Sequence, residues 1–278
     1  EKLRAYDYVV ANPPFSVKTW TTGLTPESDP YQRFAWGVPP AKQGDYAFLL
    51  HIIRSLKSTG KGACILPHGV LFRGNAEAVI RQQLVRSGYL KAVIGLPANL
   101  FYGTGIPACI LLLDKENATA RKGIFMIDAS KGFKKDGPKN RLREQDIHRI
   151  VDTFTRQVEI AGYARLVPVA EISDAKNDFN LNLPRYIDTT DAEDVQDITA
   201  HLRGGITDRD LDGLELERAF AGPPRFVGPP DEPFGLRLPE HLLALRREME
   251  LLHAVAQLLG LARLQVETLQ RILRRTLA

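Results

Sequence analysis

The sequence DYVVANPPF, residues Asp7 to Phe15, joins a short predicted β-strand to an amide, two prolines and an aromatic ring. Residues 7–11 have the composition of a buried strand. The corner that follows is rigid, because each proline fixes its own φ. Polar groups at the carboxyl end of a strand mark the edge at which open α/β sheets bind ligands. We therefore expect this corner to carry the chemistry of the protein.

Beyond the corner, predicted helices and strands alternate along the chain. Apolar periodicity predicts helices over residues 45–59 and 76–87, with Asp45 as a candidate cap of the first. Buried strands are predicted over residues 63–67, 90–96, 106–113 and 123–128, and Gly60-Lys61-Gly62 is predicted as a turn. This alternation is typical of a doubly wound α/β sheet. The last three strands have no helix between them, which predicts antiparallel pairing there.

The segment between residues 16 and 44 is predicted to be irregular, and it contains Trp20, Phe34 and Trp36. Long irregular segments in compact domains are usually functional or disordered, and the tryptophans argue against disorder. Two interpretations stay open here. The segment is either a substrate-facing loop beside the corner or an Ω-loop packed on the domain.

A basic loop is predicted over residues 131–143, where Asp136 is the one acidic residue. Its cationic residues are Lys131, Lys134, Lys135, Lys139, Arg141 and Arg143. Such a loop can follow a phosphate backbone, and a solvated surface loop is the alternative. We predict a helix over residues 144–160, an extended segment over 165–172 and a turn-rich segment over 177–182.

The composition is that of an ordinary globular protein, with 278 residues, 44% hydrophobic and 25% charged. A net charge of +4 permits a nucleic-acid partner without demanding one. Cys64 and Cys109 lie in apolar runs, which predicts buried thiols and fits a reducing, cytoplasmic location. No apolar run approaches the length of a membrane span, and no metal-ligand spacing is present.

The composition changes after Ala221. Short helices are predicted over residues 192–202 and 208–220, and a stiff proline-rich linker over 222–240. Residues 241–278 have apolar positions at coiled-coil spacing, which predicts one long amphipathic helix that needs a partner helix, in this chain or another. We therefore predict four parts: a catalytic part over 1–150, a mixed helical and extended continuation over 151–221, the linker, and an assembly helix.

The corner has groups that suit a reaction at a planar amine, such as the N6 amino group of adenine. The lone pair of this amine is delocalised into the ring, which makes it a poor nucleophile. Two acceptors, the Asn12 side-chain oxygen and the Pro13 carbonyl, can bind its N–H groups and favour a localised lone pair. Phe15 can stack on the ring, so that positioning supplies most of the catalysis. An ordinary turn is the alternative interpretation of Asn-Pro-Pro.

Asn12-Pro13-Pro14-Phe15 resembles motif IV of the amino-group DNA methyltransferases. Longer stretches are similar to the modification subunit of type I restriction-modification systems: residues 44–49, 66–74, 93–101, 104–111 and 140–142. The resemblance covers about residues 1–190. It implies the C-terminal part of a Rossmann-like methyltransferase sheet with an antiparallel end, followed by a helical tail.

The resemblance also implies a function, N6-adenine methylation of double-stranded DNA with the target base flipped out of the helix. It implies S-adenosyl-L-methionine as cofactor, and a specificity subunit and a restriction subunit as partners. By resemblance, Asn12, Pro13, Pro14 and Phe15 are catalytic, and Asn12 and Pro14 border the methyl donor.

This sequence departs from the family pattern in one respect. The family's glycine-rich cofactor loop precedes Asn-Pro-Pro-Phe, and no such loop lies before Asp7. Neither Gly60-Lys61-Gly62 nor Gly103-Thr104-Gly105 is a substitute, since neither connects a strand to a following helix. We therefore expect the chain to be a C-terminal piece or one half of a split protein. The alternatives are a non-catalytic assembly module that binds a specificity subunit, and a methyltransferase acting on RNA or on protein glutamine.

Overall fold

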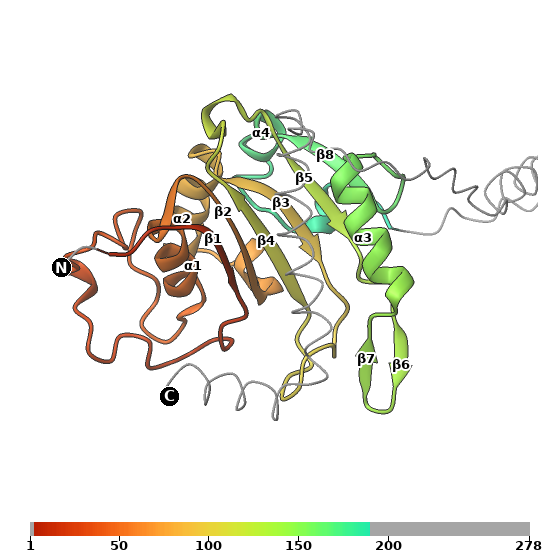
Figure 1. Ribbon diagram of the computed structural model, residues 1–278, viewed down its shortest axis with the longest axis horizontal. Coiled ribbons are helices and arrows are strands. Elements are labelled where there is room, and N and C mark those ends of the chain that lie inside the picture. Colours follow the sequence, from red (N-terminus) through yellow and green to blue (C-terminus); the bar gives the residue numbers. More distant parts are fainter. Residues whose placement is uncertain (1–2, 190–278) are drawn as a thin grey trace, which may run out of the picture. The chain divides into compact units, whose positions relative to one another are not determined.

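The computed structural model describes residues 3–189, and they form a mixed α/β fold around one six-stranded sheet (Figure 1). The sheet has the strand order β1-β2-β4-β3-β5-β8. Its strands are β1 (Tyr6–Ala11), β2 (Leu56–Pro67), β3 (Leu90–Gly95), β4 (Ala108–Asp114), β5 (Gly123–Asp128) and β8 (Ala164–Pro168). A separate hairpin consists of β6 (Lys134–Asp136) and β7 (Lys139–Arg141).

The helices lie on both faces of this sheet (Figure 1). Helices α1 (Asp45–Arg54) and α2 (Ala76–Arg86) pack on one face, and α3 (Glu144–Arg156) packs on the other. A short helix, α4 (Val169–Ile172), follows β8, and 3-10 turns span Pro26–Ser28, His68–Leu71, Ala118–Ala120 and Leu183–Arg185. The predicted α/β fold class is thus confirmed.

Alternation along the strands builds the two cores. In β2, Cys64 and Leu66 face the layer of α1 and α2, whereas Ala63 and Ile65 face the layer of α3. Successive side chains of a strand point to opposite faces, so continuous apolar runs fill both sides. Cys64 and Cys109 are free and buried, as predicted, and burial raises the pKa of both thiols.

The pairing of the last strands differs in part from the prediction. Strand β4 is antiparallel to both β2 and β3, as the short connection between β3 and β4 requires. The prediction was wrong for β5, which pairs parallel to β3. Strand β4 cannot pair with β5 because β2 and β3 already lie on its two sides. Strand β5 therefore pairs with the free side of β3.

Two boundaries near β2 also differ from the prediction. Helix α1 ends at Arg54, not near residue 59, and Gly60-Lys61-Gly62 lies inside β2 rather than in a turn. The pairing with β1 extends β2 backward to Leu56, which lies opposite Tyr6. A Cβ at Gly60 would lie 3.0 Å from the Tyr6 carbonyl oxygen, so this close strand contact favours glycine.

The first strand is less buried than expected. Its position matches the predicted residues 7–11, but Tyr6 is 47% exposed and Tyr8 is 38% exposed. Within residues 3–189, β1 is an edge strand that pairs only with β2. An edge position leaves one side of a strand open, which sequence alone does not distinguish from a central position.

The later segments show smaller corrections. The basic segment 131–143 is the β6–β7 hairpin rather than a loop, and α3 ends at Arg156 rather than at residue 160. Residues 165–172 divide into β8 and α4. The turn-rich segment 177–182 is confirmed, with positive φ at Asp178 and Phe179. The predicted short helices, linker and assembly helix after residue 189 lie outside the described residues.

The long segment after the corner is packed rather than open. Trp20 and Phe34 are buried in the core beside α1, with ring centroids 5.4 Å apart. The Trp20 indole N–H donates a hydrogen bond of 3.0 Å to the Pro40 carbonyl. These contacts favour the Ω-loop interpretation for the part that carries Trp20 and Phe34. No helix in the described part of the chain is long and apolar enough to cross a membrane.

Candidate functional site

The corner lies at the carboxyl end of β1, on the edge of the sheet where parallel strands end. Asn12 and Pro13 are half-buried, and Pro14 is exposed. Within residues 3–189, neither the Asn12 side chain nor the Pro13 carbonyl takes part in a hydrogen bond. Half-buried polar groups without an internal partner are available to a ligand. The structure thus leaves both predicted acceptors available.

A second segment completes a pocket with this corner. The loop between β3 and β4 brings Phe101, Tyr102, Gly103 and Thr104 against Asn12-Pro13-Pro14-Phe15, and together they line a cavity of about 380 Å³. The rings of Phe15 and Phe101 meet edge to face, with centroids 5.7 Å apart and an interplanar angle of 69°. The pocket therefore combines two amine acceptors with an aromatic wall, which suits a planar, amine-bearing ring.

Asp45 holds the corner in place from the start of α1. Its side chain is fully buried, and its Oδ1 accepts a hydrogen bond of 2.7 Å from the backbone N–H of Ser16. Its Oδ2 pairs with the Arg73 guanidinium at 2.6 Å. Ser16 has φ of +52°, a left-handed conformation that serine rarely adopts without such support. The prediction of Asp45 as the helix cap was wrong, because Gly44 is the N-cap of α1 and Asp45 is its first residue. The contact of Asp45 with Ser16 could not be read from local sequence.

The loop between β3 and β4, residues 96–107, is called the wall loop below, and the neighbouring β6–β7 hairpin holds it in place. The Lys139 ammonium donates hydrogen bonds to the carbonyls of Phe101 and Thr104, at 2.8 and 2.9 Å. Asn140 donates from its side chain to the Ala98 carbonyl and from its backbone to the Asn99 carbonyl, at 2.7 and 2.9 Å. No sequence motif singled out Phe101 or Tyr102 as pocket residues. The one signal was the place of Phe101 at the end of the family-like stretch 93–101, and Tyr102 lies just beyond that stretch.

The basic residues of the hairpin region divide into two groups. Lys139 binds the wall loop, the Lys131 ammonium donates to the Thr189 carbonyl, and Arg143 pairs with Asp146 at 2.8 Å at the start of α3. The hydrogen bonds with Arg143 lower the pKa of Asp146. In contrast, Lys134, Lys135 and Arg141 are exposed on the hairpin. Lys134 and Arg141 occupy opposed positions of the ladder, so their side chains share one face.

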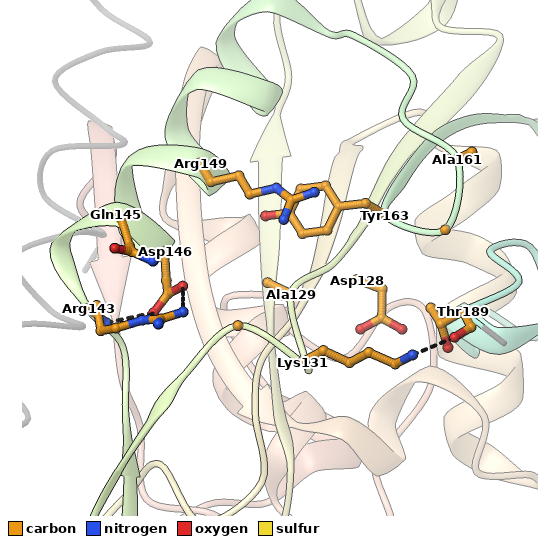
Figure 2. A pocket seen from close by; sticks show the side chains of 12 residues that line it. Asp128, Ala129, Lys131, Arg143, Gln145, Asp146, Arg149, Ala161, Tyr163 and Thr189 are labelled. Atoms are coloured by element: carbon orange, nitrogen blue, oxygen red, sulfur yellow. Dashed lines mark hydrogen bonds and ion pairs between the residues drawn. The ribbon is translucent and has the colours of Figure 1, made fainter. Parts of the chain in front are cut away.

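A further pocket, of about 430 Å³, lies beside the carboxyl end of β5 (Figure 2). It is lined mainly by charged and polar groups that already have partners. The Arg149 guanidinium stacks 4.0 Å from the centroid of the Tyr163 ring, and Asp128 accepts a hydrogen bond from the Ser130 N–H. Burial raises the pKa of Tyr163 to about 12. These internal contacts engage most of the charged side chains that line the pocket.

The residues at the end of β2 are mostly structural. Arg73 bridges Asp45 and the buried Glu77, with an Nε–Oε2 distance of 2.7 Å to the latter. Asn75 precedes α2 with φ of +55° and makes no side-chain cap. His68 is half-buried, and burial lowers its pKa. Within residues 3–189, no group of three His, Cys, Asp or Glu side chains is placed to hold a metal ion.

The described residues fit only part of the site that a bound S-adenosylmethionine would need. Gly60 and Gly62 lie within β2, and Gly103 and Gly105 lie in the wall loop. Neither pair forms the turn from a strand into a helix N-terminus that binds nucleotide-like cofactors in α/β folds. Residues 3–189 therefore contain the pocket at the Asn12–Phe15 corner but no cofactor-binding loop of this kind.

The fold and the corner define a class of protein: a Rossmann-like α/β protein with an amino-methyltransferase motif at the carboxyl edge of its sheet. The chain belongs to the N-6 DNA Methylase family, whose model matches residues 1–195.

Its relatives include methylase subunits of type I restriction enzymes. It is 33% identical to the MjaVII methylase subunit of Methanocaldococcus jannaschii over 70% of this chain and 35% of the relative. It is 34% identical to the HindI methylase subunit of Haemophilus influenzae, over 71% of this chain and 47% of the relative. The chain thus spans between a third and a half of the length of these curated relatives.

A solved structure shares both sequence and fold with this chain. The type I restriction-modification methyltransferase subunit from Streptococcus thermophilus is 38% identical, with a TM-score of 0.61. The match covers 68% of this chain and 39% of that one. The predicted resemblance to this family is confirmed.

Proposed function

We propose that this chain provides the adenine-binding part of an N6-adenine DNA methyltransferase, the modification subunit of a type I restriction-modification system. The observation that carries the proposal is the Asn12–Phe15 corner, whose amide and carbonyl have no internal partner within residues 3–189 and face an aromatic wall. Membership of the N-6 DNA Methylase family supports the choice of adenine in DNA, and the relatives, named as methylase subunits of type I restriction enzymes, support the restriction-modification system.

The corner would act by positioning the amine. The Asn12 Oδ1 and the Pro13 carbonyl oxygen accept hydrogen bonds from the two N–H groups of adenine N6, which favours a lone pair directed out of the ring plane. Phe15 holds the face of the base, and Phe101 supports Phe15 from its edge. S-adenosylmethionine would supply the electrophilic methyl group, with Asn12 and Pro14 beside it. The base must leave the DNA helix to enter such a pocket.

The multi-subunit assembly is part of the same proposal. A specificity subunit would read the DNA sequence and a restriction subunit would cut, as the resemblance to type I restriction-modification systems implies. Residues 241–278 would supply the helix that packs on the specificity subunit. A cytoplasmic location would follow from this function.

Two measurements on the protein encoded by the full reading frame of this chain test the proposal. We expect mass spectrometry to detect N6-methyladenine in a DNA substrate incubated with S-adenosylmethionine and the assembled subunits. Methylation of RNA or of protein glutamine, but not of DNA, would refute DNA as the substrate and support the alternative substrates. Calorimetry of the 278-residue chain with S-adenosylmethionine addresses the assembly-only alternative. Tight binding by the chain alone would exclude that alternative, and no methylation by the complete assembly would refute the proposed function.

The hairpin predicts a separate effect on DNA affinity. Changing Lys134, Lys135 and Arg141 together to alanine should weaken binding to all DNA sequences equally, because phosphate contacts carry no sequence information. If each residue contacts one phosphate, the slope of log affinity against log salt should decrease by about 0.9 per residue.

A matched control for the hairpin is Lys122→Ala. Lys122 is exposed and directly precedes β5, whereas the hairpin follows the other end of this strand. We expect this control to bind DNA like the wild type in fluorescence-anisotropy titrations at several salt concentrations. An unchanged slope in the triple variant would exclude the hairpin from the DNA interface.

A further inference from the structure

We infer that Lys139 is a positioning residue, which holds the aromatic wall of the pocket rather than a DNA phosphate. Its ammonium group donates to the carbonyl oxygens of Phe101 and Thr104 at 2.8 and 2.9 Å. These two carbonyls lie on either side of Tyr102 and Gly103, at the tip of the loop that faces Asn12. Lysine has three N–H donors and no acceptor, so one side chain can bind both carbonyls at once.

The loop needs this external support because few of its own contacts hold the tip. The backbone N–H of Asn99 donates a long hydrogen bond of 3.3 Å to the Gly105 carbonyl, and this bond closes the base of the loop. Gly103 adopts a φ of +78°, and Tyr102 is 75% exposed. Leu100 and Phe101 are buried in the core, but the tip beyond Phe101 buries little apolar surface, and such segments open easily. The two bonds from Lys139 are therefore the contacts that fix the tip relative to the hairpin.

The same hairpin links the wall to the proposed DNA interface. Arg141 lies two residues beyond Lys139 on β7, and Lys134 lies opposite Arg141 on β6. Asn140, between Lys139 and Arg141, binds the base of the loop at Ala98 and Asn99. A phosphate bound by the exposed residues would thus order the strand that holds Phe101 beside Phe15. This consequence for catalysis rests on the proposed function, whereas the contact between Lys139 and the loop does not.

Replacing Lys139 by methionine tests the inference, because methionine keeps an unbranched stem and removes all three donors. We expect Lys139→Met to reduce kcat by about 10- to 100-fold, since a misplaced wall misaligns the base. The KM for DNA and the salt slope should remain close to wild type. Lys139→Arg, which retains N–H donors, should recover most of the lost rate.

Hydrogen exchange provides a readout that does not depend on activity. In the full chain, the amides of residues 99–106 should exchange at least about tenfold faster in Lys139→Met than in wild type. Lys122→Met is the matched control and should alter neither exchange nor kcat. Unchanged exchange would overturn the inference even if methylation failed. If wild-type protein transfers no methyl group but the loop exchange rises in the variant, the proposed function fails and the positioning role stands.

A measurement on wild-type protein covers the case in which the variant does not fold. Reductive methylation followed by peptide mass spectrometry reports the accessibility of each lysine ammonium. Lys139 should react at least about tenfold more slowly than Lys134, because its N–H groups are bound to two carbonyls. Equal rates for both lysines would overturn the inference. A lower salt slope in Lys139→Met with unchanged kcat would instead assign Lys139 to a phosphate contact.

Discussion

Replacing Asn12 by alanine is expected to reduce the rate of DNA methylation by about 10²- to 10³-fold, because it removes one of two preorganised acceptors from the reacting amine. DNA affinity should change little, since Asn12 lies in the pocket rather than on the exposed hairpin. The measurement is kcat for N6-methyladenine formation in single turnover, with the assembled subunits and saturating DNA.

A graded series makes this prediction more specific. Asn12→Asp keeps an oxygen acceptor at the position of the Asn12 Oδ1, so it should retain more activity than Asn12→Ala. Asn12→Leu fills a similar volume without an acceptor and should be as slow as alanine. If leucine and aspartate variants had the same rate, shape rather than hydrogen bonding would explain the role of Asn12. A rate within a few-fold of wild type in Asn12→Ala would contradict the acceptor role itself.

The second large effect concerns stability. Replacing Asp45 by alanine should lower the free energy of unfolding by about 3 kcal/mol, because it removes a fully buried carboxylate and leaves the Arg73 guanidinium paired with Glu77 alone. The change also removes the acceptor for the Ser16 N–H, so the corner loses its support. For a domain of this size we expect the melting temperature to fall by roughly 10 °C. Urea unfolding of the full chain, followed by circular dichroism, measures the effect.

An exposed ion pair supplies the control for Asp45. Asp7 pairs with Lys57 at 2.7 Å, but both side chains are about half exposed or more. Asp7→Ala should therefore change the stability by no more than about 1 kcal/mol. Asp45→Asn should fall between the two, because its amide oxygen can still accept from Ser16 but no longer carries charge. Equal losses for Asp45→Ala and Asp7→Ala would show that burial of the Asp45 pair has no special role.

Local sequence predicted the elements whose patterns are strong. Helix α2 was expected over residues 76–87 and spans Ala76–Arg86, and β5 matches the predicted residues 123–128. These segments have a clear periodicity or a continuous apolar run between turn residues. Boundaries were predicted less well where a long-range pairing extends a strand. Residues 56–59 join β2 because β2 pairs with β1, although they were predicted to continue α1.

The candidate site was predictable on one side only. Asn12, Pro13, Pro14 and Phe15 are consecutive, so their chemistry can be read directly from the chain. Phe101 and Tyr102 lie far along the sequence, and only the sheet topology brings their loop to the same edge. The basic residues show the same limit. All six have equal charge in the sequence, but the fold engages Lys131, Lys139 and Arg143 in internal contacts.

The sequence by itself therefore determined the chemical groups of the corner, the α/β class and the family of this chain. These properties depend on neighbouring residues and on local periodicity, which folding does not alter. Only the tertiary structure decided the strand order β1-β2-β4-β3-β5-β8 and the meeting of Phe15 with Phe101. It also decided which lysine holds the pocket and which lysines face solvent. Such contacts depend on the pairing and packing of segments that are distant in sequence. Strands compete for the same partner in the sheet, and local propensity does not decide which of them pairs with it.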